Sequence, residues 1–143
     1  MIRRLKTQGA NQSELCDIYN KHVRSILENS AAVWHAGLTQ INSTDIEHVQ
    51  KSAFSIILGK NYKSYENALR ILGMEKLKDR RENICLKFAQ KSLKSKKFSS
   101  WFVPDTKSVN TRRKLTKVKG VKTRTARFEK SALPFLSSIL NKN

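Results

Sequence analysis

The residues of this sequence with an evident chemistry are its lysines and arginines, and that chemistry is the binding of phosphate. Between Met74 and Lys96 the chain repeats basic residues at offsets that place side chains on one side of a helix. The cations of this stripe are Lys76, Arg80, Lys87, Lys91 and Lys94. Like charges four places apart weaken a helix, so a phosphate-bearing partner would relieve the repulsion. A solvated helix face would show the same pattern and is the alternative.

Arg81 follows Arg80 directly and makes an arginine pair within the stripe. Arginine binds phosphate through a planar fork of donors, so both residues are candidates for contacts with a nucleic-acid backbone. Local pairing of one of them with Asp79 or Glu82 is the alternative.

A second set of basic residues lies toward the C-terminus, where no acidic residue occurs between Asp105 and Glu129. We expect a nucleic-acid-binding arm here, with nuclear targeting as the alternative. Two-residue spacing around Gly120-Val121 permits a weak β-ribbon, and disorder until a partner binds is the other expectation. The candidate contacts of this arm are Arg112, Arg113, Lys117, Lys119, Lys122, Arg124 and Arg127.

Catalytic and metal-binding patterns are not evident. His22, His35 and His48 lie thirteen residues apart on different segments, and the sequence has no Ser–His–Asp arrangement, glycine-rich phosphate loop or zinc knuckle. Cys16 and Cys85 lie on the apolar sides of expected helices, which favours buried thiols over a disulfide. We therefore expect no cofactor, no metal and no small-molecule substrate.

The two tryptophans could stack on bases or pack in a core. Trp34 falls on the apolar side of an expected helix, where packing is the usual role. Trp101 lies in a less regular stretch, so either role is open.

Net charge strengthens the case for a polyanionic partner. The 143 residues include 29 Lys+Arg against 11 Asp+Glu, a formal charge of +18, which makes nucleic acid the leading candidate. The charge grows along the chain, from +2 in residues 1–60 to +7 in 61–103 and +9 in 104–143. A neutral packing unit followed by a phosphate-binding surface fits this gradient.

No run of about 18 apolar residues and no secretory signal is visible, so we expect no membrane partner. The chain is expected inside the cell, in the nucleus or the cytoplasm.

Apolar spacing predicts the helices that must position these cations. We expect helices at 13–36, 43–58, 64–72 and 75–96, with one shared core. The first would begin at Ser13 as its cap and bury Leu15 and Ile26 on one face. Gly59 and Gly73 would end the second and third helices.

The organisation expected from this pattern is mainly α, a small helical bundle with a basic, partly disordered C-terminal extension and a short terminal helix. Its parts would be a basic lead-in at 1–12, a helical domain at 13–103, a basic linker or arm at 104–130 and the short helix at 131–143.

The order of these segments is similar to that of a known family. The chain resembles the C-terminal end of reverse transcriptases of non-LTR (LINE-like) retrotransposons, namely the helical thumb and the extension after it. The pieces that carry the resemblance are Val23-Arg24 with Leu27-Glu28 and Val33-Trp34, Ile46-Glu47 with Val49-Gln50-Lys51, and Leu77 with Arg80-Arg81. The resemblance implies a thumb-like bundle that grips RNA or an RNA/DNA hybrid through its phosphates, behind an upstream palm domain.

Polymerases of this family hold two metal ions with paired aspartates in the palm. The aspartates of this chain are isolated from one another, at Asp17, Asp45, Asp79 and Asp105. We therefore expect a fragment of an RNA-directed DNA polymerase that is no enzyme by itself. The alternatives are an independent basic RNA- or DNA-binding protein and a decayed coding remnant with no selected function.

Overall fold

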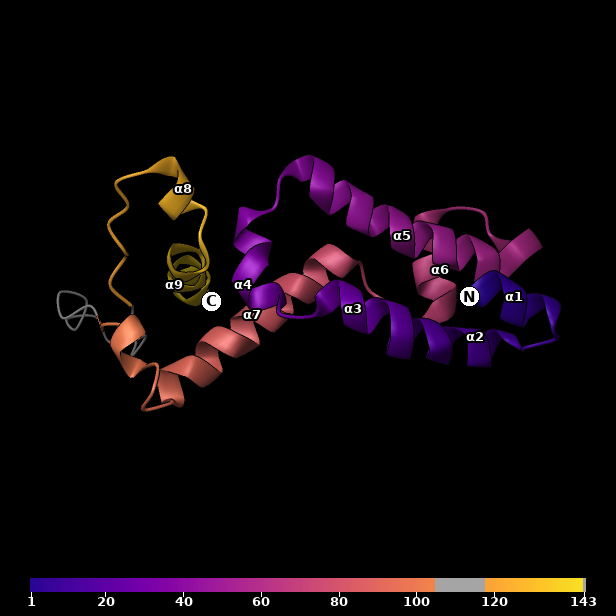
Figure 1. Cartoon of the computed structure of the whole chain (residues 1–143), viewed down its shortest axis with the longest axis horizontal. Helices are drawn as coiled ribbons and strands as arrows, with labels where there is room; N and C mark the ends of the chain where they lie inside the picture. The colour runs from indigo at the N-terminus through magenta and orange to yellow at the C-terminus, as the bar shows by residue number, and fades with distance from the viewer. Residues whose placement is uncertain (105–117, 143) are drawn as a thin grey trace. The chain divides into compact units, whose positions relative to one another are not determined.

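Helices form most of the chain in the computed structural model, which describes residues 1–104 and 118–142 (Figure 1). The expected mainly α class with a short terminal helix is confirmed. The structure divides into two compact units. The first unit is Met1–Asn29 with Thr39–Arg80, and the second is Ser30–Leu38 with Arg81–Asn143. The disorder expected within the basic arm concerns 105–117, which lie outside the described residues.

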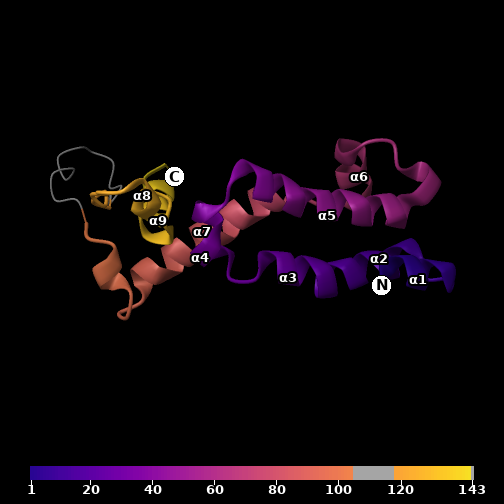
Figure 2. The same cartoon turned by 45° about the horizontal axis from the view of Figure 1, so that its top comes forward.

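The first unit is built on the long helix α5 (Gln40–Leu58). Two shorter helices, α1 (Ile2–Thr7) and α6 (Tyr65–Leu72), both contact α5 (Figure 2). The hydroxyl of Thr39 caps α5 by accepting the N–H of Asn42, so α5 begins three residues before the expected start.

Local signals mark the other helix ends of the first unit. Ser64 caps α6 and Gly73 ends it in the left-handed conformation, as expected. The helix α2 (Gln12–Ile18) begins at Asn11, whose side chain accepts the N–H of Glu14 while the Glu14 carboxylate accepts the N–H of Asn11. This reciprocal cap replaces the expected cap at Ser13.

Phe54 lies at the centre of the first core. Its ring is fully buried, with the Tyr19 ring at 5.5 Å and the Tyr65 ring at 6.1 Å between centroids. Ile2 of α1 is buried in the same cluster, and the Lys6 ammonium donates to the carbonyls of Ile56 and Ile57 at the end of α5. The segment expected as a basic lead-in is therefore part of this core.

A π-helical turn (Tyr19–Arg24) follows α2 and changes which residues face inward. Each π-turn adds about one residue to the helical repeat, which rotates the following residues by about 100°. In α3 (Ser25–Glu28), Ile26 is consequently 73% exposed, although the sequence pattern places it in the core. The expected apolar face of 13–36 is therefore wrong at Ile26, whereas Val23 of the same face packs against the first core.

The expected helix 13–36 also breaks at Asn29 and Ser30. Ser30 has a φ of 54° and a ψ of 27°, the left-handed region that disfavours a continuing helix. The chain resumes as α4 (Ala31–Trp34), which belongs to the second unit.

The second unit contains α4 and the larger part of α7 (Leu77–Lys94), followed by a 3-10 turn (Ser99–Trp101), α8 (Ala126–Glu129) and α9 (Ala132–Lys142). Its core cluster consists of Ala32, Cys85, Ala89, Phe102, Val118 and Leu136. The buried apolar residues thus form two clusters, whereas the apolar faces of the four expected helices suggested one shared core.

Candidate nucleic-acid interface

Three lysines form a row on the exposed side of α7. Lys87, Lys91 and Lys94 are separated by four and three residues, which places them on one face of the helix. The opposite side of α7 is buried at Cys85 and Ala89. We call Lys87, Lys91 and Lys94 the lysine row. Lys76, the first cation of the expected stripe, is also exposed, but it precedes α7 and pairs with Glu66 at 3.6 Å.

Arg80, expected in the same stripe, is engaged within the first unit instead. Its guanidinium donates two hydrogen bonds to the Glu28 carboxylate, Nε to Oε1 at 2.6 Å and one terminal nitrogen to Oε2 at 3.2 Å. The hydrogen bond to Glu28 raises the pKa of Arg80. Arg24 lies 4.0 Å from the same carboxylate. Arg80 is therefore removed from the expected phosphate contacts, because its charge is already paired.

Arg81 is also removed from the expected contacts. It is fully buried in the second unit, and its guanidinium carbon lies 6.0 Å from the ring centroid of Trp34, within the range of a cation–π contact. A phosphate could reach this group only if the unit opened. Sequence reasoning missed the burial because Trp34 lies 47 positions earlier in the chain.

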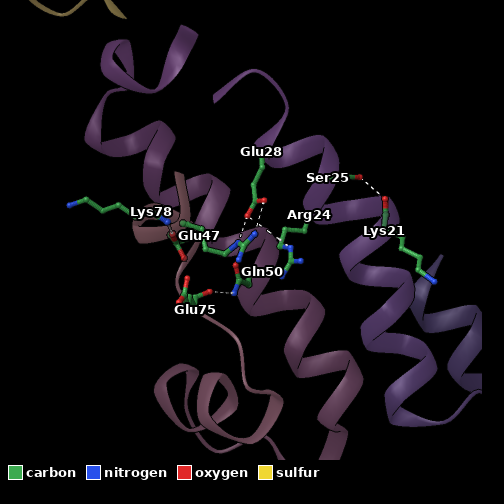
Figure 3. Close-up of polar contacts among 9 residues, drawn as sticks. Lys21, Arg24, Ser25, Glu28, Glu47, Gln50, Glu75 and Lys78 are labelled. Carbon is green, nitrogen blue, oxygen red and sulfur yellow. Dashed lines mark hydrogen bonds and ion pairs between the residues drawn. The ribbon is translucent and has the colours of Figure 1, made fainter. Parts of the chain in front are cut away.

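The start of α7 is held by two further polar contacts in the first unit. The Glu47 carboxylate accepts the backbone N–H of Lys78 at 2.6 Å (Figure 3). It also accepts the hydroxyl of Tyr65 at 2.6 Å. The first N–H groups of a helix have no partner inside it, so Glu47 caps α7 from a distance. The side chain of Gln50 donates to the carbonyl of Glu75 at 3.0 Å, just before the helix. Burial and the Glu47 hydrogen bond raise the pKa of Tyr65.

The basic C-terminal segment is described only in part. Lys119, Lys122, Arg124 and Arg127 are exposed, whereas Arg112, Arg113 and Lys117 lie outside the described residues. The expected β-ribbon around Gly120-Val121 does not form in 118–125, where the structure shows one isolated antiparallel bridge, Val118 with Pro104.

Val118 anchors the beginning of this described segment. Its N–H donates to the Asn141 side-chain oxygen and its carbonyl accepts from the Asn141 side-chain nitrogen, both at 2.9 Å. The Val118 side chain is buried in the second core. The exposed cations that follow Val118 therefore lie on a segment whose first residue is held in place.

The charge of the chain is concentrated in the second unit. By sequence this unit holds 17 Lys+Arg and three Asp+Glu, a net charge of +14, whereas the first unit holds 12 and eight, a net charge of +4. A net charge of this size in one unit attracts polyanions and repels other cations.

Sequence reasoning missed a basic hollow in the first unit. It is an open depression of about 420 Å³ and is lined by Arg3, His48, Lys51, Ser52, Ser55, Ile56 and Tyr62. The spacing of His48, Lys51 and Ser55 on α5 could have indicated one face of a helix. Arg3 lines the hollow only because α1 packs against α5, and no local sequence pattern predicts this packing.

Within 1–104 and 118–142 the structure contains no group of three or more His, Cys, Asp or Glu side chains placed to hold a metal ion. No helix among the same residues is long and apolar enough to cross a membrane. Cys16 and Cys85 are free thiols, and burial raises the pKa of Cys85 to about 11. A comparison with protein-family models, curated proteins and solved structures finds no match to this chain.

Proposed function

We propose that this chain binds the phosphate backbone of nucleic acid and has no catalysis of its own. The observation that carries the proposal is the lysine row, which is exposed on α7 in a unit of net charge +14. The three lysines lie within eight residues of α7, and no acidic residue on the same face neutralises them. A polyanion would supply the missing charge.

The dimensions of the lysine row suit a nucleic-acid strand. From Lys87 to Lys94 the helix rises about 10 Å, at about 1.5 Å per residue. A strand of B-DNA carries one phosphate per about 3.4 Å of axis, so the row can follow about three successive phosphates. Lysine binds phosphate as a point charge and tolerates variation in the exact position of each phosphate.

Binding of this kind carries little sequence information. Contacts to phosphate fix where a protein lies on a duplex, whereas sequence is read at base edges. We therefore expect similar affinity for duplexes of different sequence. An RNA/DNA hybrid is the partner that the family resemblance favours.

We further propose that the chain is a thumb-like fragment of a non-LTR retrotransposon reverse transcriptase. The resemblance described above supports this, since Glu28, Glu47 and Arg80, which belong to its quoted pieces, make the contacts that hold the start of α7. The partner domain of such a fragment would be a palm.

Salt dependence tests the binding proposal. The logarithm of the association constant for a fluorescent duplex is plotted against the logarithm of salt concentration, and a slope of roughly −5 to −9 is expected if about six to ten phosphates are neutralised. The triple variant Lys87→Gln, Lys91→Gln, Lys94→Gln should reduce that slope by about two to three units.

A matched control separates local contact from total charge. Lys21, Lys60 and Lys63 are exposed lysines of the first unit, so changing all three to Gln removes the same charge elsewhere. The control should alter the slope by less than about one unit. Equal effects of the two triple variants, or a slope near zero in the unaltered chain, would refute the proposal.

Primer extension tests the thumb proposal. The purified chain should extend no primer on any template with Mg²⁺ or Mn²⁺, because the paired carboxylates of a two-metal site are not among its residues. Joined behind a palm domain of this family that lacks its own thumb, the chain should restore extension. Extension by the chain alone, surviving repurification, would contradict the proposal, as would a joined protein no more active than the palm by itself.

A further inference from the structure

Trp101 is a large aromatic side chain that remains exposed while its backbone is fixed. Trp101 is 43% exposed. The ring of Phe98 meets its indole edge-on, with ring centroids 4.8 Å apart and an angle of 60° between the ring planes. The next residue, Phe102, is only 2% exposed and belongs to the second core. The indole is therefore supported by the Phe98 ring, on a backbone that buried Phe102 anchors, and it keeps surface available to a ligand.

The other tryptophan is not available in this way. Trp34 is partly buried, and the guanidinium of buried Arg81 lies over its ring. Trp101 is thus the more exposed of the two tryptophans.

Exposed cations flank Trp101 in sequence and in the fold. Lys97 precedes the supporting Phe98 and is exposed. Lys119 is exposed and lies eighteen residues after Trp101 in sequence, but its backbone N–H donates to the carbonyl of Val103 at 2.8 Å. This hydrogen bond places the Lys119 backbone beside a residue that is two positions from Trp101. A single exposed apolar residue is ordinary on a protein surface, but an aromatic between cations is a combination that suits nucleic acid.

Acidic residues that would repel a phosphate are missing from the described surroundings. The stretches 83–104 and 118–128 contain no Asp or Glu, and Asp105 lies outside the described residues. Within these two described stretches an anionic strand therefore meets no like charge.

We infer that Trp101 is a stacking platform for an unpaired nucleobase, with Lys97 and Lys119 contacting the phosphates on either side of that base. The inference rests on the proposed function and adds a ligand class to it, namely nucleic acid with a single-stranded stretch. Every base presents a π-face to an indole, so stacking adds affinity without reading sequence. A base inside a blunt duplex is already stacked on its neighbours and cannot occupy the platform.

The test compares three labelled ligands of one sequence, measured with the full chain by fluorescence anisotropy. They are a blunt RNA/DNA hybrid, the same hybrid with a five-nucleotide overhang, and the single strand. Trp101→Ala should weaken binding of the single strand and the overhang by about 5- to 100-fold and change binding of the blunt hybrid less than about twofold. Trp101→Phe keeps a π-face and should retain most of the affinity, whereas Trp101→Leu keeps apolar bulk alone and should behave like Trp101→Ala.

Intrinsic fluorescence gives a second readout. The single strand should quench the tryptophan emission of the unaltered chain, and this quenching should disappear in Trp101→Phe, in which Trp34 remains the only tryptophan. A circular dichroism melt of each variant shows whether the fold is kept, as expected for a residue that is 43% exposed.

The outcomes distinguish this inference from the proposed function. Equal weakening of blunt and overhang ligands in Trp101→Ala, unchanged binding of both, or quenching that persists in Trp101→Phe would overturn the platform and leave phosphate binding in place. A failure of the unaltered chain to bind any of the three ligands would instead overturn the proposed function, and the platform with it.

Discussion

The Arg80 guanidinium and the Glu28 carboxylate form a two-point hydrogen-bonded ion pair between residues 52 positions apart in the chain. Both side chains are largely shielded, Glu28 at 12% and Arg80 at 31% side-chain exposure. A pair of this geometry is stronger than a flexible surface ion pair, since both bonds are charge-assisted and the guanidinium fork matches the carboxylate. Within the first unit it ties the end of α3 to the first turn of α7.

Glu28→Gln should therefore destabilise the protein measurably. The amide leaves the shielded guanidinium of Arg80 without a compensating charge, so the free energy of unfolding should fall by about 1–3 kcal/mol. Urea denaturation followed by circular dichroism measures this change. Glu66→Gln is the matched control, because Glu66 pairs with Lys76 at 3.6 Å while remaining 64% exposed, and it should cost less than about 1 kcal/mol. Equal losses in the two variants would contradict the role given to the Arg80–Glu28 pair.

Substitutions in 13–28 should distinguish the two helical phases on either side of the π-turn. Ile26→Asp should change the free energy of unfolding by no more than about 0.5 kcal/mol, because the side chain is in solvent. Leu15→Ala should cost about 2–5 kcal/mol, because Leu15 is 1% exposed in the first core. Thermal melts of both variants at one pH measure the difference. A larger loss for Ile26→Asp would mean that the α-helical period continues past Tyr19.

The thiol of Cys85 should be slow to react. Burial raises the pKa of Cys85 to about 11, and the reactive form is the thiolate. At pH 8 a Cys16→Ala chain, which retains Cys85, should react with iodoacetamide at least about tenfold more slowly when folded than in urea. The Cys85→Ala chain retains partly buried Cys16 and is the comparison, expected to react faster. Similar rates for the folded and unfolded Cys85 chain would contradict the burial.

The same thiol makes stability depend on alkaline pH. The folded chain holds the Cys85 proton up to a pKa of about 11, whereas an unfolded cysteine releases it near the ordinary value of 9.0. Between these values the folded state binds more protons than the unfolded state, so the free energy of unfolding falls as pH rises from about 9 to 11. Cys85→Ala should have a smaller decline over this range, and urea melts at several pH values would reveal it. An equal decline in both chains would assign the effect to other groups.

Local rules sufficed where a helix carries its own start and stop signals. The helix from Tyr65 to Leu72 could be predicted because Ser64 and Gly73 each act within a few residues. The spacing of Lys87, Lys91 and Lys94 likewise indicates a common face in any α-helix. These features depend on neighbours in sequence alone.

The features that could not be predicted depend on contacts between residues that are far apart in the sequence. Arg81 has the same sequence signature as an exposed cation, and its burial depends on Trp34 and the second core. Arg80 could not be recognised as paired, because Glu28 belongs to another helix. The hollow beside Arg3 depends on α1 packing against α5. Tertiary partners of this kind leave no periodic trace in a single sequence.

The π-helical turn at Tyr19–Arg24 has a consequence for length variation in this helix. Removing one residue of this turn, such as exposed Lys21, would convert it to α-helix. Because the π-turn already contains about one residue more than an α-helix needs for the same rotation, Ile26 and the residues after it would keep their present faces, and Glu28 would stay aligned with Arg80. A one-residue deletion within the π-turn would thus be absorbed locally, whereas the same deletion in a regular α-helix would rotate every side chain that follows it by about 100°.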